Sequence, residues 1–332
     1  MKKKVIIPIV IVLCLFIFFF VAPLIVAKVV NDKIFKKRSE VNDTFKLSVS
    51  DYPNLKVENI SFKSNNNQLQ GYLYSSDTLT PKGVVIYSHG FNCGGSNSTM
   101  MFADFFVSND YYYFTYDATA NGLSEGNNQK GLVQGVLDLD KAISCVKAND
   151  KLKNYPIMLL GHSWGGYNVC SVLKYHPDVK AVCSISGFIN ANDLMVSSAK
   201  KKVGSFLTNT SKPYLDLYER FIFGSKKNLN GLDGLKSSEC KCLIIHSSDD
   251  RLIETKYGYD KYYKEFKDNP RFSFKLYNNR QHGYIFLNDE ARNMVNAYMD
   301  EGKSFNKELY INGLDTDMFN QILDLYNNSL NN

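Results

Sequence analysis

The sequence predicts an α/β protein: a mainly parallel sheet flanked by helices, with a helical cap insertion and an N-terminal transmembrane helix. The first observation is a set of short, continuous apolar runs of the kind that fill the middle of a parallel sheet. They lie at residues 83–90, 111–117, 156–163, 179–187, 241–248 and 271–278. The second is a set of amphipathic stretches that predict helices between the runs, at residues 131–150, 163–176, 254–268 and 289–302. The third is a long apolar segment near the N-terminus.

That segment, Val5–Ala27, holds 23 uncharged residues. It is long enough to cross a hydrocarbon core of roughly 30 Å. The alternative is a cleaved signal peptide, whose apolar region is usually about 7–15 residues and ends in a small-x-small site. The longer run and the basic residues after it favour an uncleaved anchor over residues 1–30, although cleavage stays open.

Charge does not settle the orientation of this anchor. Three lysines precede the span and five basic residues follow it by Arg38, so the positive-inside rule finds the two sides nearly equal. The seven cysteines form no repeating framework, which favours free thiols and a reducing compartment. The short N-terminal tail favours the extracytoplasmic side instead. The side that holds the body of the protein therefore stays open.

The rest of the chain divides by composition. Residues 31–54 are polar and predict a tether, and residues 55–332 predict one domain. The domain opens with two alternating runs around Asn65–Asn67, which predict an antiparallel hairpin. About fifty residues without a strong strand follow Phe188, so a cap is expected at about 189–240. The tail beyond Lys303 carries a further helical pattern at 318–328.

Charge and motifs exclude several classes of function. The net charge is +6, but residues 1–38 hold eight basic and one acidic side chain, which leaves −1 for the remainder. A near-neutral body argues against a nucleic-acid partner. The sequence contains no Walker loop and no strand-linked G-x-G-x-x-G, so no motif indicates a nucleotide cofactor. The pair Cys240 and Cys242 lacks a second pair, so strand packing is favoured over a metal site.

The strongest motif is Gly161-His162-Ser163-Trp164-Gly165, which fits G-x-S-x-G. It directly follows an apolar run and opens a helical pattern, as a strand–turn–helix nucleophile elbow requires. Such a tight turn needs small residues two before and two after the serine. It would raise the hydroxyl of Ser163 above the sheet at a helix N-terminus, where the backbone N–H of Trp164 is free to donate.

A serine hydroxyl needs a general base. The chain has five histidines, and His282 is the one in a loop after the final apolar run, ahead of a helix. The others lie within the elbow, at a helix end or at strand ends. His282 is therefore the predicted base. An acid must orient it, and Asp249 and Asp250 follow the apolar run at 241–248, which gives the chain order serine, aspartate, histidine.

An oxyanion site needs a second donor beside the Trp164 amide. His89-Gly90-Phe91 ends an apolar run and starts the glycine-rich loop FNCGGS. In the nucleophile-elbow arrangement a backbone N–H from this loop joins the one after the serine, and Phe91 is the candidate. The alternative is a plain strand-to-helix turn.

Together these motifs resemble the α/β-hydrolase superfamily, in its serine-aminopeptidase-like and monoacylglycerol-lipase-like branch. The resemblance covers roughly Val57–Gly302 and rests on HGF at 89–91, GHSWGG at 161–166, HSSDD at 246–250 and HG at 282–283. It implies that the acid lies four residues after a strand-end His or Gly, and counting from His246 gives Asp250. The loop at 116–126 departs from the family pattern, because Ala120 and Asn121 stand where an Arg-Gly pair is common.

The sequence therefore predicts a membrane-anchored serine hydrolase that cleaves an ester, amide or thioester through an acyl-serine intermediate. Ser163, His282 and Asp250 would form the triad, and the amides of Phe91 and Trp164 would hold the oxyanion. No cofactor or metal is expected, and the substrate would be a small-molecule, peptide or lipid acyl compound. Two alternatives stay open: an acyltransferase on the same triad, and a non-catalytic membrane-bound binding protein with this fold.

Overall fold

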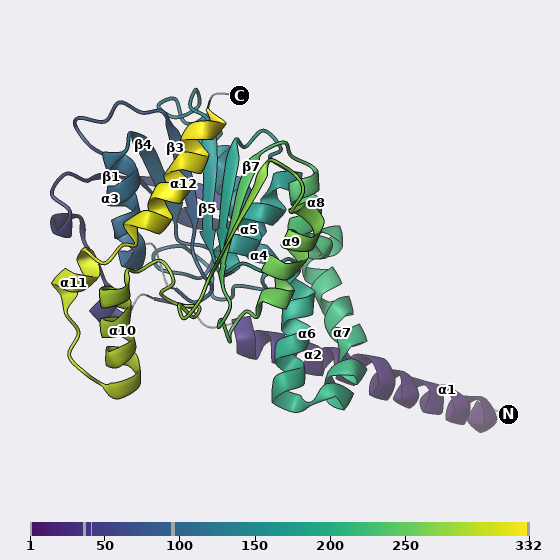
Figure 1. Cartoon of the computed structure of the whole chain (residues 1–332). Helices are drawn as coiled ribbons and strands as arrows, with labels where there is room; N and C mark the ends of the chain where they lie inside the picture. The colour runs from purple at the N-terminus through teal and green to yellow at the C-terminus, as the bar shows by residue number, and fades with distance from the viewer. Residues whose placement is uncertain (1, 36–37, 41, 94–96, 331–332) are drawn as a thin grey trace.

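The computed structural model describes residues 2–35, 38–40, 42–93 and 97–330. Its centre is an eight-stranded sheet in the order β1-β2-β4-β3-β5-β6-β7-β8 (Figure 1). The strands are β1 Lys56–Ser64, β2 Asn67–Ser75, β3 Gly83–Ser88, β4 Tyr111–Tyr116, β5 Ile157–His162, β6 Ala181–Ile185, β7 Lys241–Ser247 and β8 Phe272–Tyr277. The first two strands form the predicted antiparallel hairpin, β2 pairs antiparallel with β4, and the remaining pairs are parallel. The predicted mainly parallel α/β fold is confirmed.

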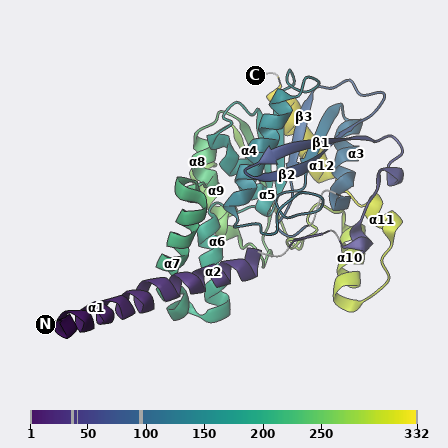
Figure 2. The same cartoon turned by 180° about the vertical axis from the view of Figure 1, so that it is seen from behind.

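Helices cover both faces of the sheet (Figures 1 and 2). Those of the domain are α3 Met100–Ser108, α4 Val133–Ala148, α5 Trp164–Ser171, α6 Ala191–Val203, α7 Ser205–Phe223, α8 Gly231–Lys236, α9 Tyr259–Phe266, α10 Asp289–Glu301, α11 Lys307–Ile311 and α12 Thr316–Ser329. Helices α4, α5, α8 and α9 contribute to one core, and α3, α10 and α12 to the other. Helix α3 is apolar on almost every side, so its sequence lacks the amphipathic pattern that predicted the other helices.

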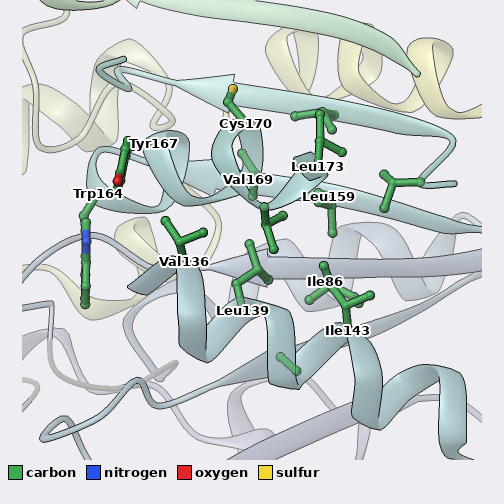
Figure 3. Close-up of a cluster of buried hydrophobic side chains, with 14 of the residues drawn as sticks. Ile86, Val136, Leu139, Ile143, Leu159, Trp164, Tyr167, Val169, Cys170 and Leu173 are labelled. Carbon is green, nitrogen blue, oxygen red and sulfur yellow. The ribbon is translucent and has the colours of Figure 1, made fainter. Parts of the chain in front are cut away.

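Successive side chains of the central strands point in turn into the two hydrophobic cores, one on each face of the sheet. Val84 and Ile86 of β3 enter the core under α4 and α5, whereas Val85 and Tyr87 enter the opposite one. This follows from the two-residue period of a strand, which points successive side chains to opposite faces. Figure 3 shows the first core, where residues of α4 and α5 pack on Ile86 and on Leu159 of β5.

The N-terminal segment is one continuous helix, made of α1 Lys2–Phe16, a π-helical turn at Ile17–Val21 and α2 Ala22–Phe35. Over Ile6–Phe35 it is long and apolar enough to cross a membrane, and its most apolar window is not buried in the protein. A signal sequence would have the same properties. The helix extends past residue 30, where the predicted anchor ends.

The segment predicted as a polar tether, residues 31–54, lies against the domain. Phe35 is buried in the core under α4 and α5, and Phe45, Leu47 and Tyr52 are buried in the opposite core. Its many polar residues are spaced so that a few large apolar side chains still face inward. The average composition of the segment therefore does not indicate that it packs on the domain.

Helices α6 and α7 form the hairpin that projects from the domain within the expected cap interval (Figure 1). Helix α8 lies in the same interval but packs on α5: a Cβ on Gly234 would come 2.0 Å from the carbonyl oxygen of Cys170. The projecting part is therefore shorter than residues 189–240. Helix α7 also contacts the N-terminal helix, because the hydroxyl of Tyr214 donates to the carbonyl of Phe19 at 2.8 Å. A regular α-helix would pair the carbonyl of Phe19 with the backbone N–H of residue 23, but residue 23 is a proline and has no N–H to donate.

A carboxyl on α7 makes the stability of the cap sensitive to pH. Burial raises the pKa of Glu219 to about 7, although nearby Lys227 opposes the rise. A carboxyl whose folded-state pKa lies above its unfolded value of about 4.5 favours folding in full only below that value, and the advantage is lost as the pH rises through 7. We expect Glu219→Gln to raise the free energy of unfolding by about 1–2 kcal/mol at pH 8 and by almost nothing at pH 5. Thermal unfolding in detergent at both pH values measures this, and an equal effect at both would contradict it.

Candidate active site

Ser163 occupies a strained turn between β5 and α5. Its backbone angles are φ 58° and ψ −115°, a conformation that residues other than glycine rarely adopt. The turn is possible because the glycines on either side lack side chains. A Cβ on Gly161 would lie 2.2 Å from the carbonyl oxygen of Gly165, and one on Gly165 would lie 1.8 Å from that of Ser88. The strand–turn–helix setting predicted for Ser163 is therefore present, and the residue itself is 9% exposed.

His282 reaches this serine from the loop after β8. Its Nε2 lies 2.8 Å from the Oγ of Ser163, and its Nδ1 lies 2.6 Å from Oδ2 of Asp250. In the neutral arrangement Nδ1–H donates to the carboxylate, so Nε2 is left to accept the serine proton. The three residues predicted from the sequence lie in one chain of hydrogen bonds.

Asp250 is buried at the end of β7 and is held by several donors. Its Oδ1 accepts the backbone N–H groups of Leu252 and Ile253 at 2.9 and 2.8 Å. On the other side, the Nε2 of His246 lies 3.3 Å from Oδ2. Burial by itself raises the pKa of Asp250, but hydrogen bonds from His246 and His282 outweigh burial and hold this pKa well below its usual range. The carboxylate therefore stays ionised at neutral pH and can stabilise a protonated His282.

The neighbouring Asp249 has a different position. Its Oδ1 accepts the backbone N–H groups of Arg280 and Gln281, both at 3.2 Å, and the hydroxyl of Ser247. Gln281 has a positive φ of 55°. Asp249 thus fixes the backbone just before His282, whereas Asp250 contacts the imidazole itself.

Two further histidines have roles that the sequence did not indicate. The Nε2 of His162 lies 2.9 Å from the carbonyl oxygen of His282, and burial lowers the pKa of His162 to about 3. It is a neutral donor that supports the His282 loop. His89 accepts the N–H of Ala118 at Nε2 and donates from Nδ1 to the carbonyl of Gly90. These partners lie up to 120 residues away, so no local pattern could have revealed them.

The two predicted oxyanion donors come from two segments that meet at the serine. Trp164 is the first residue of α5, and Phe91 follows Gly90, where an added Cβ would come 3.5 Å from the Cβ of Ser163. Within the described part of the chain, neither the Phe91 nor the Trp164 backbone N–H donates a hydrogen bond. These are the two amides that the sequence predicts as oxyanion donors. The rest of the predicted loop, Gly94–Ser96, lies outside the described residues.

No group of three or more His, Cys, Asp or Glu side chains that could hold a metal ion occurs among the described residues. The chemistry that this arrangement can perform is nucleophilic catalysis. It needs a serine, a base within hydrogen-bond distance and an acid that orients the base.

Comparison with known proteins agrees with this fold. A family model described as serine aminopeptidase, S33, matches residues 80–237, a range that includes Ser163 and ends before Asp250 and His282. No curated protein matches the sequence. The chain therefore has the α/β-hydrolase fold, and its residues 80–237 resemble the serine aminopeptidase family.

Three solved structures illustrate the likeness. An esterase from Pyrococcus furiosus has a TM-score of 0.57 and 17% identity, over 81% of this chain and 94% of the esterase. An acylaminoacyl peptidase from Pyrococcus horikoshii has a TM-score of 0.52 and 18% identity, over 70% of this chain and 38% of the peptidase. Est1E from Butyrivibrio proteoclasticus, solved with ferulic acid bound, has a TM-score of 0.52 and 15% identity, over 73% of this chain and 97% of Est1E. At these identities the likeness concerns the fold.

Proposed function

We propose that this chain is a membrane-anchored serine hydrolase that cleaves an ester, amide or thioester through an acyl-serine intermediate. The observation that carries the proposal is the continuous hydrogen-bond chain from Ser163 through His282 to Asp250. A chain of this kind is what a serine hydroxyl needs to become a nucleophile.

In the first half of the reaction, the Oγ of Ser163 attacks the carbonyl carbon of the substrate as its proton passes to Nε2 of His282. The amides of Phe91 and Trp164 donate to the oxyanion of the tetrahedral intermediate. His282 then gives the proton to the leaving alcohol, amine or thiol, and the acyl group stays on Ser163. In the second half, His282 takes a proton from water, the hydroxide attacks the acyl carbon, and the acid leaves as the proton returns to Ser163.

Two features support membrane anchoring. One is the apolar helix over Ile6–Phe35. The other is the α6–α7 hairpin beside it, which carries the largely exposed apolar side chains of Phe206 and Phe221. We propose residues 1–30 as the anchor and residues 55–332 as the hydrolase domain, with an acyl compound as substrate.

The test is fluorophosphonate labelling of cells that express the full chain. We expect the probe on Ser163, in the membrane fraction, resistant to carbonate and released by detergent. Ser163→Ala should abolish the label. Ser144→Ala is the matched control: this exposed serine donates to the carbonyl of Asp140 on the outer side of α4, so the variant should label like the wild type.

Folded wild-type chain that stays unlabelled would refute the nucleophile and favour the binding protein. Label in the soluble fraction would refute the anchor alone. Faster product formation with an added alcohol acceptor, at constant labelling, would favour the acyltransferase.

A further inference from the structure

The C-terminal end of the N-terminal helix docks on the domain (Figure 2), and its Phe35 contacts Phe91, one of the two proposed oxyanion residues. Along α2, Asn31 and Phe35 are 5% and 2% exposed, whereas Val30 and Ile34 are 41% and 40% exposed. One side of the last helical turn is therefore part of the protein interior. An anchor that served only as a tether would need no such contact, because a flexible polar linker would hold the domain near the membrane.

A row of aromatic rings joins this helix end to both proposed oxyanion residues. The ring of Phe35 packs edge-to-face on Phe91, with centroids 5.6 Å apart and planes at 79°. Phe91 packs in the same way on Trp164, at 5.5 Å and 85°. Edge-to-face pairs at this separation are attractive and fix the relative tilt of the rings. Because Phe91 and Trp164 carry the two amides in question, the position of Phe35 bears directly on the spacing of those amides.

The segment at 128–132 makes a second connection between the same parts. The backbone N–H of Gln129 donates to the carbonyl of Phe35 at 2.8 Å, and its side-chain amide donates to Oδ1 of Asn92 at 3.2 Å. Asn92 follows Phe91 directly. Further along, the indole N–H of Trp164 donates to the carbonyl of Leu132 at 2.6 Å. The segment is thus bonded to the helix end, to the residue after Phe91 and to Trp164.

Arg38 fixes the chain just beyond the helix. Its guanidinium donates to the carbonyl oxygens of Gly122, Ser124 and Gly126 at 2.7, 2.9 and 2.7 Å. Ser39 then pairs with the same loop through backbone hydrogen bonds to Ala120 and Gly122. Five directional bonds therefore prevent the helix end from sliding along the surface of the domain.

We propose that the C-terminal end of α2 is a structural part of the active site, and that Phe35 is a positioning residue that holds the oxyanion amides through Phe91. The inference rests on the proposed function. It assigns to the N-terminal helix a role in catalysis beyond attachment to the membrane. Loss of the Phe35 ring leaves Phe91 free to tilt and moves its amide away from the oxyanion, which costs transition-state stabilisation rather than substrate binding.

The test compares Phe35→Ala, Phe35→Leu and Ile34→Ala in the full chain, reconstituted in detergent micelles. A small water-soluble nitrophenyl ester is the substrate, and active sites are counted by labelling Ser163 to completion with the fluorophosphonate. We expect Phe35→Ala to lower kcat per active site by about 10-fold, with KM within about 2-fold of the wild type. The kcat of Phe35→Leu should fall between those of Phe35→Ala and the wild type, because leucine fills much of the volume of the ring but lacks its edge. Ile34→Ala, on the exposed side of the same turn, should behave like the wild type.

Counting active sites separates positioning from simple loss of folded protein, because a purely structural role lowers the number of sites and leaves kcat per site unchanged. Wild-type kcat per site in Phe35→Ala would overturn the proposal. If Phe35→Ala does not fold, Phe35→Leu decides in the same way. A wild-type chain that does not label at Ser163 refutes the proposed function itself, which is a different outcome from equal kcat in labelled variants.

Discussion

Asp250→Asn should lower kcat for ester hydrolysis by about 10⁴-fold, while Asp249→Asn should lower it by less than about 10-fold. Asparagine at position 250 presents a neutral amide to Nδ1 of His282. It can favour the wrong tautomer and cannot stabilise the imidazolium. At position 249 asparagine keeps a carbonyl oxygen that still accepts from Arg280 and Gln281, so the loop is retained. The measurement is kcat per labelled site with a nitrophenyl ester.

The two adjacent aspartates form a matched pair, since each change removes one negative charge at the end of β7. Equal losses at both positions would show that the charge of the loop matters rather than the contact with His282. A larger loss at Asp249 would reassign the acid. Because the pKa of Asp250 lies well below its usual range, this carboxylate should not titrate between pH 5 and 9, and any acid limb in the rate profile belongs to another group.

Gly165→Ala should prevent folding of the domain or destabilise it by more than about 4 kcal/mol. The added methyl group would lie 1.8 Å from the carbonyl oxygen of Ser88 and 3.1 Å from that of His89. Both are backbone atoms of β3 and the loop after it, so neither can turn away as a flexible side chain would. Relief requires α5 to move off the sheet, which breaks the packing of Trp164 and Tyr167 seen in Figure 3.

Gly283→Ala is the control for this prediction. A Cβ at that position meets nothing within 4 Å, and its φ is not positive. Thermal unfolding and the yield of folded protein should match the wild type for Gly283→Ala and collapse for Gly165→Ala. A Gly165→Ala protein with wild-type thermal stability would mean that the turn at Ser163 has more room than its geometry indicates.

The fold was predictable because its signals are local. The continuous runs at β3, β5 and β7 and the helical periodicity of α4 and α10 are each visible within a window of about 15 residues. The geometry of the Ser163 turn was predictable for the same reason, since strand, glycines and helix adjoin in the sequence. The assignment of Ser163, His282 and Asp250 as a triad remains a prediction that rests on their observed hydrogen-bond distances.

The features that escaped the sequence depend on partners far along the chain. The contact between His162 and the carbonyl of His282 joins residues 120 apart, and the Arg38 bonds to Ser124 and Gly126 join residues 86 and 88 apart. Phe35 lies in a segment whose average polarity predicts a tether. Phe35 is buried because it lies on the inward side of a helical turn. The average composition of the segment does not show on which side of a helix a residue lies.

Helix α12 supports the candidate site although it lies far from Ser163 in the sequence. Arg280, two residues before His282, pairs with Asp315 at the start of α12, and the hydroxyl of Tyr326 donates to the carbonyl of Leu159 beneath the nucleophile strand at 2.8 Å. Synthesis proceeds from the N-terminus, so the apolar helix leaves the ribosome first and these supports leave last. If the N-terminal helix is the proposed membrane anchor, a nascent chain that has already inserted it would still lack the elements that hold its histidine loop and cover its sheet. Under the proposed function, we therefore expect hydrolysis only after these C-terminal supports have been synthesised and have folded.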